Sequence, residues 1–301
     1  MVKISVIILN YNAGHFLLES VQRVLHSTIP LKCIVVDNES SDDSIEKLIL
    51  AHRGETRLQV IYNNKNLGFS AGCNRALPYA DTEYILFLNP DCFIDPDTIE
   101  KMIQELEQHP QAGMASCLIR NMDGSEQRGC RRNFPTPWTA LMRVAWLYKY
   151  FLGHKYLAGF DLTNTPLPEK TINMEAISGA FMLVRRQALA EVGPLDEGYR
   201  LHAEDLDWCK RFHQKNWQII FVPHVVIRHI KGACSTKRFN FVIWHKHKGM
   251  WRFYRKIYRK QYPWIVNGMV GFAIWGRCFL HLMWANIVSF YSRRQKITKN
   301  A

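Results

Sequence analysis

Two aspartates stand directly after apolar runs that have the character of buried strands. Asp91 follows Tyr84–Leu88 after an Asn-Pro pair, and Asp37 follows residues 33–36. Proline cannot donate to a ladder, so it marks the carboxyl end of the first run. Ligands of open α/β sheets bind just outside the carboxyl ends of strands. A carboxylate at such an edge can hold a divalent metal ion against a phosphate, which is the chemistry we predict for Asp91.

A second group of acids lies at the predicted start of a helix near residue 204. Glu204, Asp205 and Asp207 supply three carboxylates within four residues. Acids at a helix N-terminus are stabilised by the helix dipole, which is the simple interpretation of this group. Three acids exceed what a helix start requires, so at least one of them is expected to have another task.

Strand-like and helix-like segments alternate through the first 120 residues at the spacing of βαβ units. This alternation predicts an α/β fold, with a mostly parallel sheet and helices on both faces. Asp95 is predicted to be the N-cap of a helix whose first residue is Pro96. Strands are predicted at residues 2–9, 33–36, 58–62, 84–88 and 114–119.

The pattern is weaker between residues 120 and 173, where four prolines interrupt it. A mobile loop and short helices are predicted there. Regular apolar spacing returns at residues 176–184, and two closing strands are predicted at 217–222 and 225–229.

The composition is that of a folded protein, with 48% hydrophobic and 22% charged residues in a chain of 301. The eight cysteines include no C-x-x-C pair. Zinc-ligand spacing is therefore absent, and a disulfide framework is not expected, which favours a reducing cytosol. The apolar run at residues 2–9 is too short for a signal peptide and is interpreted as the first strand.

The basic charge is concentrated in the C-terminal third. Residues 208–301 hold 19 of the 39 Lys and Arg residues and none of the 26 acids. This asymmetry predicts an anionic surface as partner, either lipid or nucleic acid.

The C-terminal segment combines a basic, aromatic helix with a long apolar stretch. A helix through residues 244–265 places Trp244, Trp251, Tyr254, Tyr258 and Tyr262 on one stripe, which is typical of a membrane-surface element. The apolar stretch 264–290 is long enough to span a bilayer, but Arg277 near its middle favours an in-plane or re-entrant anchor. The alternatives are base stacking on nucleic acid, which needs no apolar anchor, and a helix packed on the protein's own core.

Taken in order, several motifs resemble the inverting glycosyltransferases of family 2, and within it the rhamnosyltransferase-like branch that builds bacterial surface polysaccharides. The resemblance runs from about residue 3 to residue 235 and implies a GT-A fold with sugar transfer from a nucleotide sugar. The motifs are residues 4–12, Val35-Val36-Asp37-Asn38-Glu39-Ser40-Ser41-Asp42, Asn66-Leu67-Gly68-Phe69, Phe87-Leu88-Asn89-Pro90-Asp91, Ser178-Gly179-Ala180 and Glu204-Asp205-Leu206-Asp207.

The resemblance also implies roles for particular residues. Asp37 would accept a hydrogen bond from the ring N–H of the base, although a turn-forming aspartate is the alternative. Asp91 would hold Mg²⁺ or Mn²⁺, as the single firm ligand because Asn89 replaces the first acid of the usual Asp-x-Asp. His229 is either a further ligand or a structural histidine. The predicted nucleotide-binding residues are Asn10, Asp37, Asn38, Asn66, Gly68 and Asn89.

Inversion by direct displacement needs one general base, and by resemblance that base is Asp205. Arg131 and Arg132 are either a clamp for phosphate or a solvated pair. Gly179 and Glu204 are expected on the acceptor side with them. The chain lacks the Gln-x-x-Arg-Trp motif and the several spanning helices of processive synthases, which predicts the addition of one sugar per event.

Together these observations predict a hexosyltransferase with nucleotide-binding residues 1–119, acceptor-binding and catalytic residues 120–235, and membrane-associated residues 236–301. The predicted donor is dTDP-L-rhamnose, or another dTDP- or UDP-linked sugar, and the acceptor is a lipid-linked glycan of the O-antigen or lipopolysaccharide type. The expected location is the cytoplasmic face of the plasma membrane, with no nucleic-acid partner. The alternative from another class is a non-catalytic, nucleotide-sugar-binding scaffold at the membrane.

Overall fold

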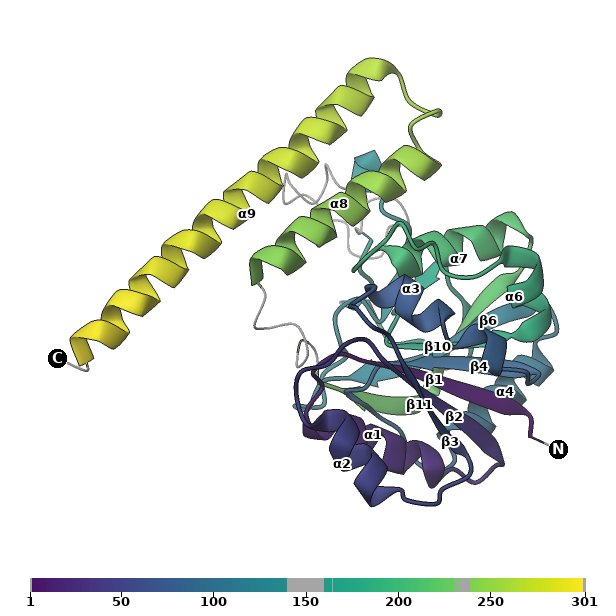
Figure 1. The fold of residues 1–301 in the computed structure, drawn as a ribbon. Helices are drawn as coiled ribbons and strands as arrows, with labels where there is room; N and C mark the ends of the chain where they lie inside the picture. Colours follow the sequence, from purple (N-terminus) through teal and green to yellow (C-terminus); the bar gives the residue numbers. More distant parts are fainter. Residues whose placement is uncertain (1, 140–159, 164, 231, 233–238, 300–301) are drawn as a thin grey trace.

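The computed structural model describes residues 2–139, 160–163, 165–230, 232 and 239–299. In this part of the chain, a single large sheet forms the core (Figure 1). Its strands follow the order β3-β2-β1-β4-β10-β6-β11-β5, and β8 also pairs with β11. The strands are β1 Ile4–Asn10, β2 Leu31–Asp37, β3 Leu58–Tyr62, β4 Tyr84–Leu88, β5 Cys92–Phe93, β6 Ala112–Arg120, β7 Arg131–Arg132, β8 Ile172–Asn173, β9 Ala176–Ile177, β10 Phe181–Arg185 and β11 Gln218–His229. The helices are α1 His15–Leu25, α2 Ser44–Ala51, α3 Phe69–Asn74, α4 Thr98–Gln108, α6 Arg186–Val192, α7 Glu204–Gln214, α8 Phe239–Ile257 and α9 Trp264–Lys299.

The parallel half of the sheet consists of β3, β2, β1 and β4, as the βαβ spacing predicted. Helices α1 and α2 lie on one side of these strands, and α3 and α7 lie on the other (Figure 1). The strand interiors are apolar because both faces are covered. Parallel strands end at the same edge, and Asn10 of β1 is in register with Asp37 of β2.

The second half of the sheet is mixed. Strand β10 runs antiparallel between β4 and β6, and β11 is parallel to β6. The two predicted closing strands form the single strand β11, with an irregularity between Val222 and Val226. Pro223 lies in that irregularity and has no N–H for a regular ladder. The end of β11 pairs with β5, which places His229 opposite Cys92.

Helix α4 begins later than the sequence predicted. Its N-cap is Asp97 and its first residue is Thr98, so the assignment of Asp95 as N-cap and Pro96 as first residue was wrong. Residues 95–98 form a turn before the helix, in which the Thr98 N–H donates to the Asp95 carbonyl and the Asp95 N–H donates to Thr98 Oγ1, both at 3.0 Å.

The segment predicted as a loop with short helices contributes two short strand pairings in its described part. β7 pairs with β9, and β8 pairs with β11. Residues 140–159 and 164, on which most of the prediction of a mobile loop falls, lie outside the described residues.

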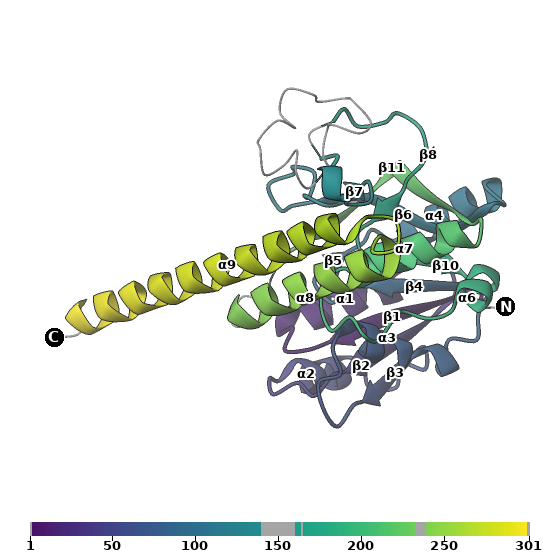
Figure 2. The ribbon, with the colours of Figure 1, turned by 90° about the horizontal axis from the view of Figure 1, so that it is seen from above.

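Helix α8 packs against the sheet domain (Figures 1 and 2). Tyr254 and Tyr258 are 5% and 7% exposed and belong to the main core. Arg252 and Lys256 each form an ion pair with Asp196 at 2.8 Å. At Tyr254 and Tyr258 the alternative of a helix packed on the protein's own core is therefore correct, and the prediction that the stripe lies on a membrane is wrong there. Trp244, at the other end of the stripe, is 46% exposed.

Helix α9 runs back along α8 and extends beyond it, away from the sheet (Figures 1 and 2). The two helices are joined by hydrogen bonds from Tyr254 to Asn267 at 2.6 Å and from Asn240 to Asn286 at 3.0 Å. The stretch Trp264–Ile287 is long and apolar enough to cross a membrane by length and composition. Its large exposed side chains are Trp264, Ile265, Met269, Phe272, Phe279, Leu280, Met283, Trp284 and Ile287.

Candidate active site

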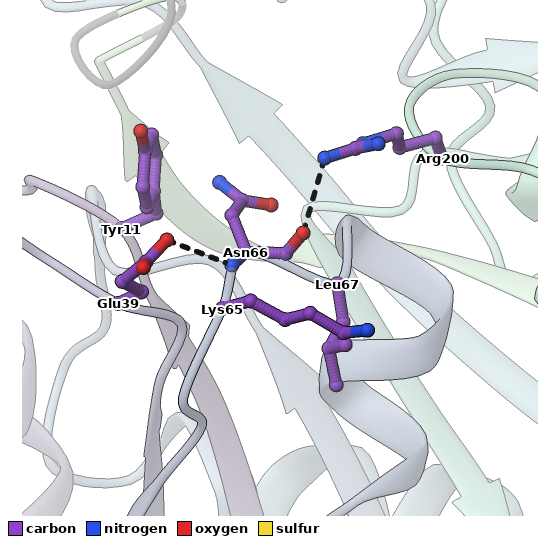
Figure 3. A pocket seen from close by; sticks show the side chains of 6 residues that line it. All are labelled: Tyr11, Glu39, Lys65, Asn66, Leu67 and Arg200. Carbon is purple, nitrogen blue, oxygen red and sulfur yellow. Dashed lines mark hydrogen bonds between the residues drawn. The ribbon is translucent and has the colours of Figure 1, made fainter.

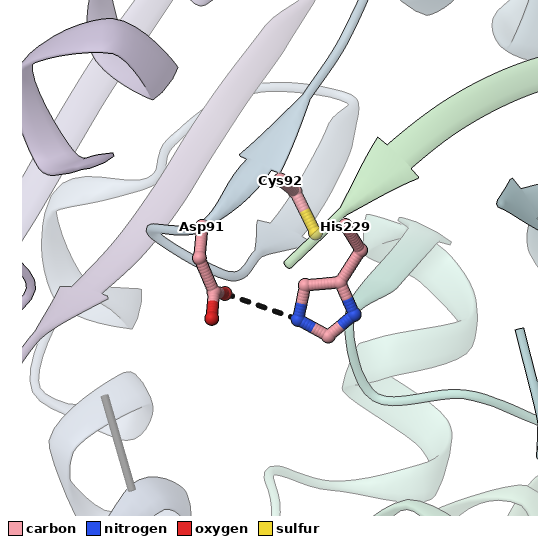
Figure 4. Close-up of side chains that lie close together, drawn as sticks. All are labelled: Asp91, Cys92 and His229. Carbon is pink, nitrogen blue, oxygen red and sulfur yellow. Dashed lines mark hydrogen bonds and ion pairs between the residues drawn. The ribbon is translucent and has the colours of Figure 1, made fainter. Parts of the chain in front are cut away.

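Asp91 and His229 meet at the carboxyl edge of the sheet, although 138 residues separate them in sequence (Figure 4). The pairing of β5 with β11 brings them together, and Asp91 Oδ1 lies 3.0 Å from His229 Nε2. Both side chains are buried, at 6% and 8% exposure. Asn89 reaches the same nitrogen at 3.5 Å through its amide.

The other ring nitrogen of His229 is held by Gln127, a residue that sequence reasoning missed. The Gln127 amide nitrogen donates to the His229 carbonyl and to Asn121 Oδ1, both at 3.0 Å. Its Oε1 therefore faces His229 Nδ1 at 2.6 Å and accepts that N–H. His229 Nε2 and Asp91 Oδ1 then face each other at one point, where an imidazole nitrogen and a carboxylate oxygen can both serve as metal ligands.

These residues fit a divalent metal ion. Carboxylate oxygen suits Mg²⁺ and Mn²⁺, imidazole nitrogen is a ligand of transition-metal ions, and a ligating histidine usually donates its other N–H to a neighbouring group. Cys92 Sγ is close enough to complete a three-residue cluster. That thiol donates to the Ala180 carbonyl at 3.5 Å, and sulfur is a poor ligand for either ion.

Asn10 supports Asp37 rather than facing a ligand. It is completely buried, and its amide nitrogen donates to Asp37 Oδ1, Ser40 Oγ and Ser44 Oγ, each at 2.9 Å. Asp37 also accepts from the Ser40 N–H at 3.2 Å and is 6% exposed. The predicted contact of Asn10 with a nucleotide is therefore replaced by a positioning role.

Asn38 shapes the loop that follows β3. It is 2% exposed, its Oδ1 accepts from the Leu67 N–H at 3.0 Å, and its amide donates to Asn66 Oδ1 at 3.2 Å. Gly68 has φ +84°, and a Cβ there would lie 2.6 Å from the Arg200 backbone oxygen. Only glycine fits at this position, because the conformation and the close approach both exclude a side chain.

A cavity of about 460 Å³ opens over the loops that follow β1, β2 and β3 (Figure 3). Asn66 is the one predicted nucleotide residue that lines it. Sequence reasoning missed the other residues that line the cavity. Their positions could have indicated them, because most of them come one to five residues after a parallel strand. The lining residues are Tyr11, Glu39, Lys65, Asn66, Leu67 and Arg200.

Asp205 lies in the first turn of α7 and is held from three sides. Its Oδ2 accepts from the Arg132 guanidinium at 2.5 Å and from the Gly179 N–H at 3.1 Å, and its Oδ1 accepts from the Leu206 N–H at 2.8 Å. A carboxylate offers about four acceptor positions. The remaining position is on Oδ1, which is the atom able to take a proton from a substrate hydroxyl.

Glu204 lies beside Asp205 in a buried position. Burial, with the charge of Asp205 as a smaller cause, raises the pKa of Glu204 to about 8. Its Oε2 and the Nε of Arg132 are buried and find no partner among the described residues. Both groups adjoin Asp205, Glu204 as its neighbour in the chain and Arg132 through its ion pair.

Arg131 differs from Arg132 because its donors are used within the protein. It forms a two-point ion pair with Glu126 at 2.8 Å and donates to Thr165, Pro166 and the Leu162 carbonyl. With 2% of its surface exposed, Arg131 ties the described part of the 160s segment to β7. We therefore retain only Arg132 in the site.

The model of glycosyl transferase family 2 matches residues 5–193. The chain belongs to this family. Its fold is GT-A, and it is a sugar-transferring enzyme, as the sequence predicted. Asp205 and His229 lie beyond the matched residues, so their roles depend on geometry.

Two curated relatives of this family 2 chain are rhamnosyltransferases at low identity. The N-acetylglucosaminyl-diphospho-decaprenol L-rhamnosyltransferase of Mycobacterium tuberculosis is 24% identical over 74% of this chain and 78% of its own length. Rhamnosyltransferase WbbL of Escherichia coli K12 is 27% identical over 70% of this chain and 83% of its own length. The rhamnosyltransferase-like branch predicted from the motifs is therefore confirmed at family level.

A solved structure supports the fold of this family 2 chain. GalNAc-T7, crystallised with UDP, GalNAc and Mn²⁺, superposes with a TM-score of 0.56 at 17% identity. The match covers 76% of this chain and 44% of the GalNAc-T7 chain, so it establishes the fold alone.

Proposed function

We propose that this enzyme transfers one L-rhamnose from dTDP-L-rhamnose to a lipid-linked glycan, with inversion, during synthesis of a bacterial cell-surface polysaccharide. The names of the two rhamnosyltransferase relatives support the sugar, and one of them also names a diphospho-decaprenol acceptor. A UDP-linked donor is the second candidate, because GalNAc-T7 was crystallised with UDP.

The observation that carries the proposal is the placement of three components at one edge of the sheet. The cavity beside Asn66 would take the nucleoside, Asp91 and His229 would lie under the diphosphate, and Asp205 would face the acceptor. Asp205 Oδ1 accepts the hydroxyl proton as the acceptor oxygen attacks the anomeric carbon. A new C–O bond forms on one face of that carbon while the bond to the diphosphate breaks on the other.

Asp91 Oδ1 and His229 Nε2 would hold the metal ion. When bound, Mg²⁺ or Mn²⁺ offsets the charge that develops on the departing diphosphate. Arg132 keeps the Asp205 carboxylate oriented through the ion pair at Oδ2, and the Gly179 N–H fixes the same oxygen. These contacts leave Oδ1 directed at substrate.

Direct sugar transfer tests this function. The purified enzyme with Mn²⁺ is expected to move labelled rhamnose from dTDP-L-rhamnose to N-acetylglucosaminyl-diphospho-polyprenol, and the same donor should raise its melting temperature. UDP-GlcNAc and UDP-galactose serve as comparison donors. Transfer from a UDP-sugar alone would replace the donor assignment. Donor binding without transfer to any acceptor would favour the non-catalytic scaffold.

We further propose that α9 associates with the cytoplasmic face of the membrane and lies in its plane. Helix α8 flanks α9 from Asn267 to Asn286, and α8 is itself fixed to the sheet domain by Arg252 and Lys256. A spanning α9 would carry this polar domain into the bilayer, which is prohibitively costly. An in-plane helix can bury its exposed apolar face at the depth of the headgroups while α8 remains on the protein.

Flotation with anionic vesicles tests this orientation. Phe272→Glu with Phe279→Glu is expected to reduce co-flotation severalfold, because these side chains are 82% and 62% exposed on one face of α9. Ile49→Glu with Leu50→Glu, at sites 43% and 67% exposed on α2, introduces the same two charges and should leave flotation unchanged. Alkaline carbonate should release the wild-type protein. Equal flotation of all three proteins would contradict membrane contact through α9, and resistance to carbonate would indicate a span.

A further inference from the structure

A second cavity of about 270 Å³ lies between α8 and the loop that leads to the catalytic acids. Leu67 and the loop residues 197–200 form one wall, and residues of α8 form the other. It shares Leu67 and Arg200 with the proposed nucleoside cavity, so the two cavities are neighbours. The α8 residues that line it are His245, Lys248 and Gly249.

The cations at this cavity differ from those further along α8. Lys256 contacts Asp196 and Asp207 at 2.8 and 2.7 Å, and Arg252 contacts Asp196. Lys248 and Arg200 form no ion pair with any residue that the structure describes.

The lining of the cavity also includes one acid, Glu197, so two cations and one acid leave a net positive charge there. Arg200 donates to the Asn66 carbonyl at 3.1 Å and lies over the Phe241 ring. Glu197 is turned to the Asn74 amide at 3.0 Å. Burial, and to a smaller extent the charges of Arg200 and Lys248, lower the pKa of His245. An anion between these groups would relieve the repulsion.

Gly249 holds α8 tightly against the catalytic loop. A Cβ at Gly249 would lie 2.5 Å from the His202 carbonyl oxygen, so a larger residue would push the helix away. His202 and Ala203 have φ of 66° and 71°, and they directly precede Glu204 and Asp205. The wall of the cavity and the catalytic carboxylate therefore belong to one closely packed unit, from which α9 projects.

We propose that this cavity binds the diphosphate of the lipid-linked acceptor, with Arg200, His245 and Lys248 as the anion-binding residues. The inference rests on the proposed function for the identity of the acceptor. The donor diphosphate is already accounted for by Asp91 and His229. The acceptor diphosphate must come close to the loop that precedes Asp205, and Gly249 in the wall of this cavity packs directly against that loop at His202. Phosphate held by arginine and lysine gives strong, charge-assisted hydrogen bonds.

Binding of farnesyl diphosphate to the full-length protein tests the site without requiring catalysis. Titration calorimetry in EDTA prevents diphosphate from binding through a metal ion, and parallel titrations with added UDP or dTDP show whether the ligand shares the donor site. Lys248→Ala is expected to weaken farnesyl diphosphate binding about tenfold, which corresponds to the loss of one charged hydrogen bond. Lys246→Ala removes the same charge from an exposed position on α8 that lines neither cavity, and it should have no effect.

Farnesol and inorganic pyrophosphate separate the contributions of the lipid chain and of the phosphates to the affinity. Lys248→Ala should weaken binding only of the ligands that carry a diphosphate. His245→Phe is a second variant, which removes the ring N–H that can donate to a phosphate oxygen, and it should also weaken binding. Equal affinities for wild type, Lys248→Ala and Lys246→Ala would overturn the proposal, as would displacement of farnesyl diphosphate by UDP. Binding that depends on Lys248, in an enzyme that transfers no sugar, would retain the anion site and refute the proposed function.

Discussion

Asp205→Asn is expected to lower the turnover of sugar transfer by about 10²–10⁴-fold while donor affinity stays close to that of the wild type. Asparagine cannot take a proton, but its amide oxygen can still accept from Arg132 and from the Gly179 N–H. The local structure should therefore survive. Single-turnover transfer of labelled sugar measures the chemical step, and titration calorimetry with the nucleotide sugar and Mn²⁺ measures donor binding.

Asp97→Asn is the matched control for this prediction. Asp97 also stands at the start of a helix, and its Oδ2 pairs with Lys101 at 2.5 Å on the surface. The control removes one negative charge from the same kind of position and should leave turnover unchanged. If Asp205→Asn retains more than about a tenth of wild-type turnover, Asp205 is not the base, since general-base catalysis is worth more than that.

Asp91→Ala is expected to weaken Mn²⁺ binding by at least about 100-fold and to abolish the metal-dependent part of donor binding. The substitution removes the carboxylate from the pair with His229 and leaves a single nitrogen ligand, which cannot hold a hard cation by itself. Electron paramagnetic resonance of free Mn²⁺ measures metal affinity without any turnover. An unchanged metal affinity would place the metal site elsewhere.

Gln127→Leu tests a residue that holds the proposed ligand His229 and does not itself bind the metal, so its effect is expected to be smaller than that of Asp91→Ala. The variant loses the acceptor for the His229 Nδ1 proton, so the tautomer that exposes Nε2 is no longer favoured. Loss of such an outer partner weakens metal affinity about 10- to 100-fold. Gln127→Glu restores an acceptor at the same position and should recover most of the affinity. If both variants bind Mn²⁺ like the wild type, Gln127 has only a packing role.

Much of the fold was predictable because its rules are local. Each parallel strand is a short apolar run followed within a few residues by polar side chains. The sequence therefore predicted that Asp37 and Asp91 lie at the carboxyl edge of the sheet, where ligands bind. The start of α7 at Glu204 was visible in the apolar spacing that follows it. The family motifs depend on the same segments, which explains why the family was recognised from sequence.

The direction of β10 and the packing of α8 were not predictable in this way. The apolar spacing of residues 176–184 specifies an extended segment but not its neighbours, and in the structure this strand lies antiparallel between two others. The stripe through Tyr254 and Tyr258 specifies a helix with one apolar face. A membrane and a protein core satisfy such a face equally well, so periodicity could not choose between them.

The sequence by itself determined the enzyme class, and it predicted the sheet edge and the carboxylates that we propose for the chemistry. Only the tertiary structure decided which side chains complete them. Arg132 reaches Asp205 across 73 residues, Gln127 reaches His229 across 102, and α8 closes over the loop before Glu204. The physical reason is that strand and helix signals arise from neighbours in the chain, whereas the partner of a buried charge is chosen by packing, which brings distant segments within hydrogen-bonding distance.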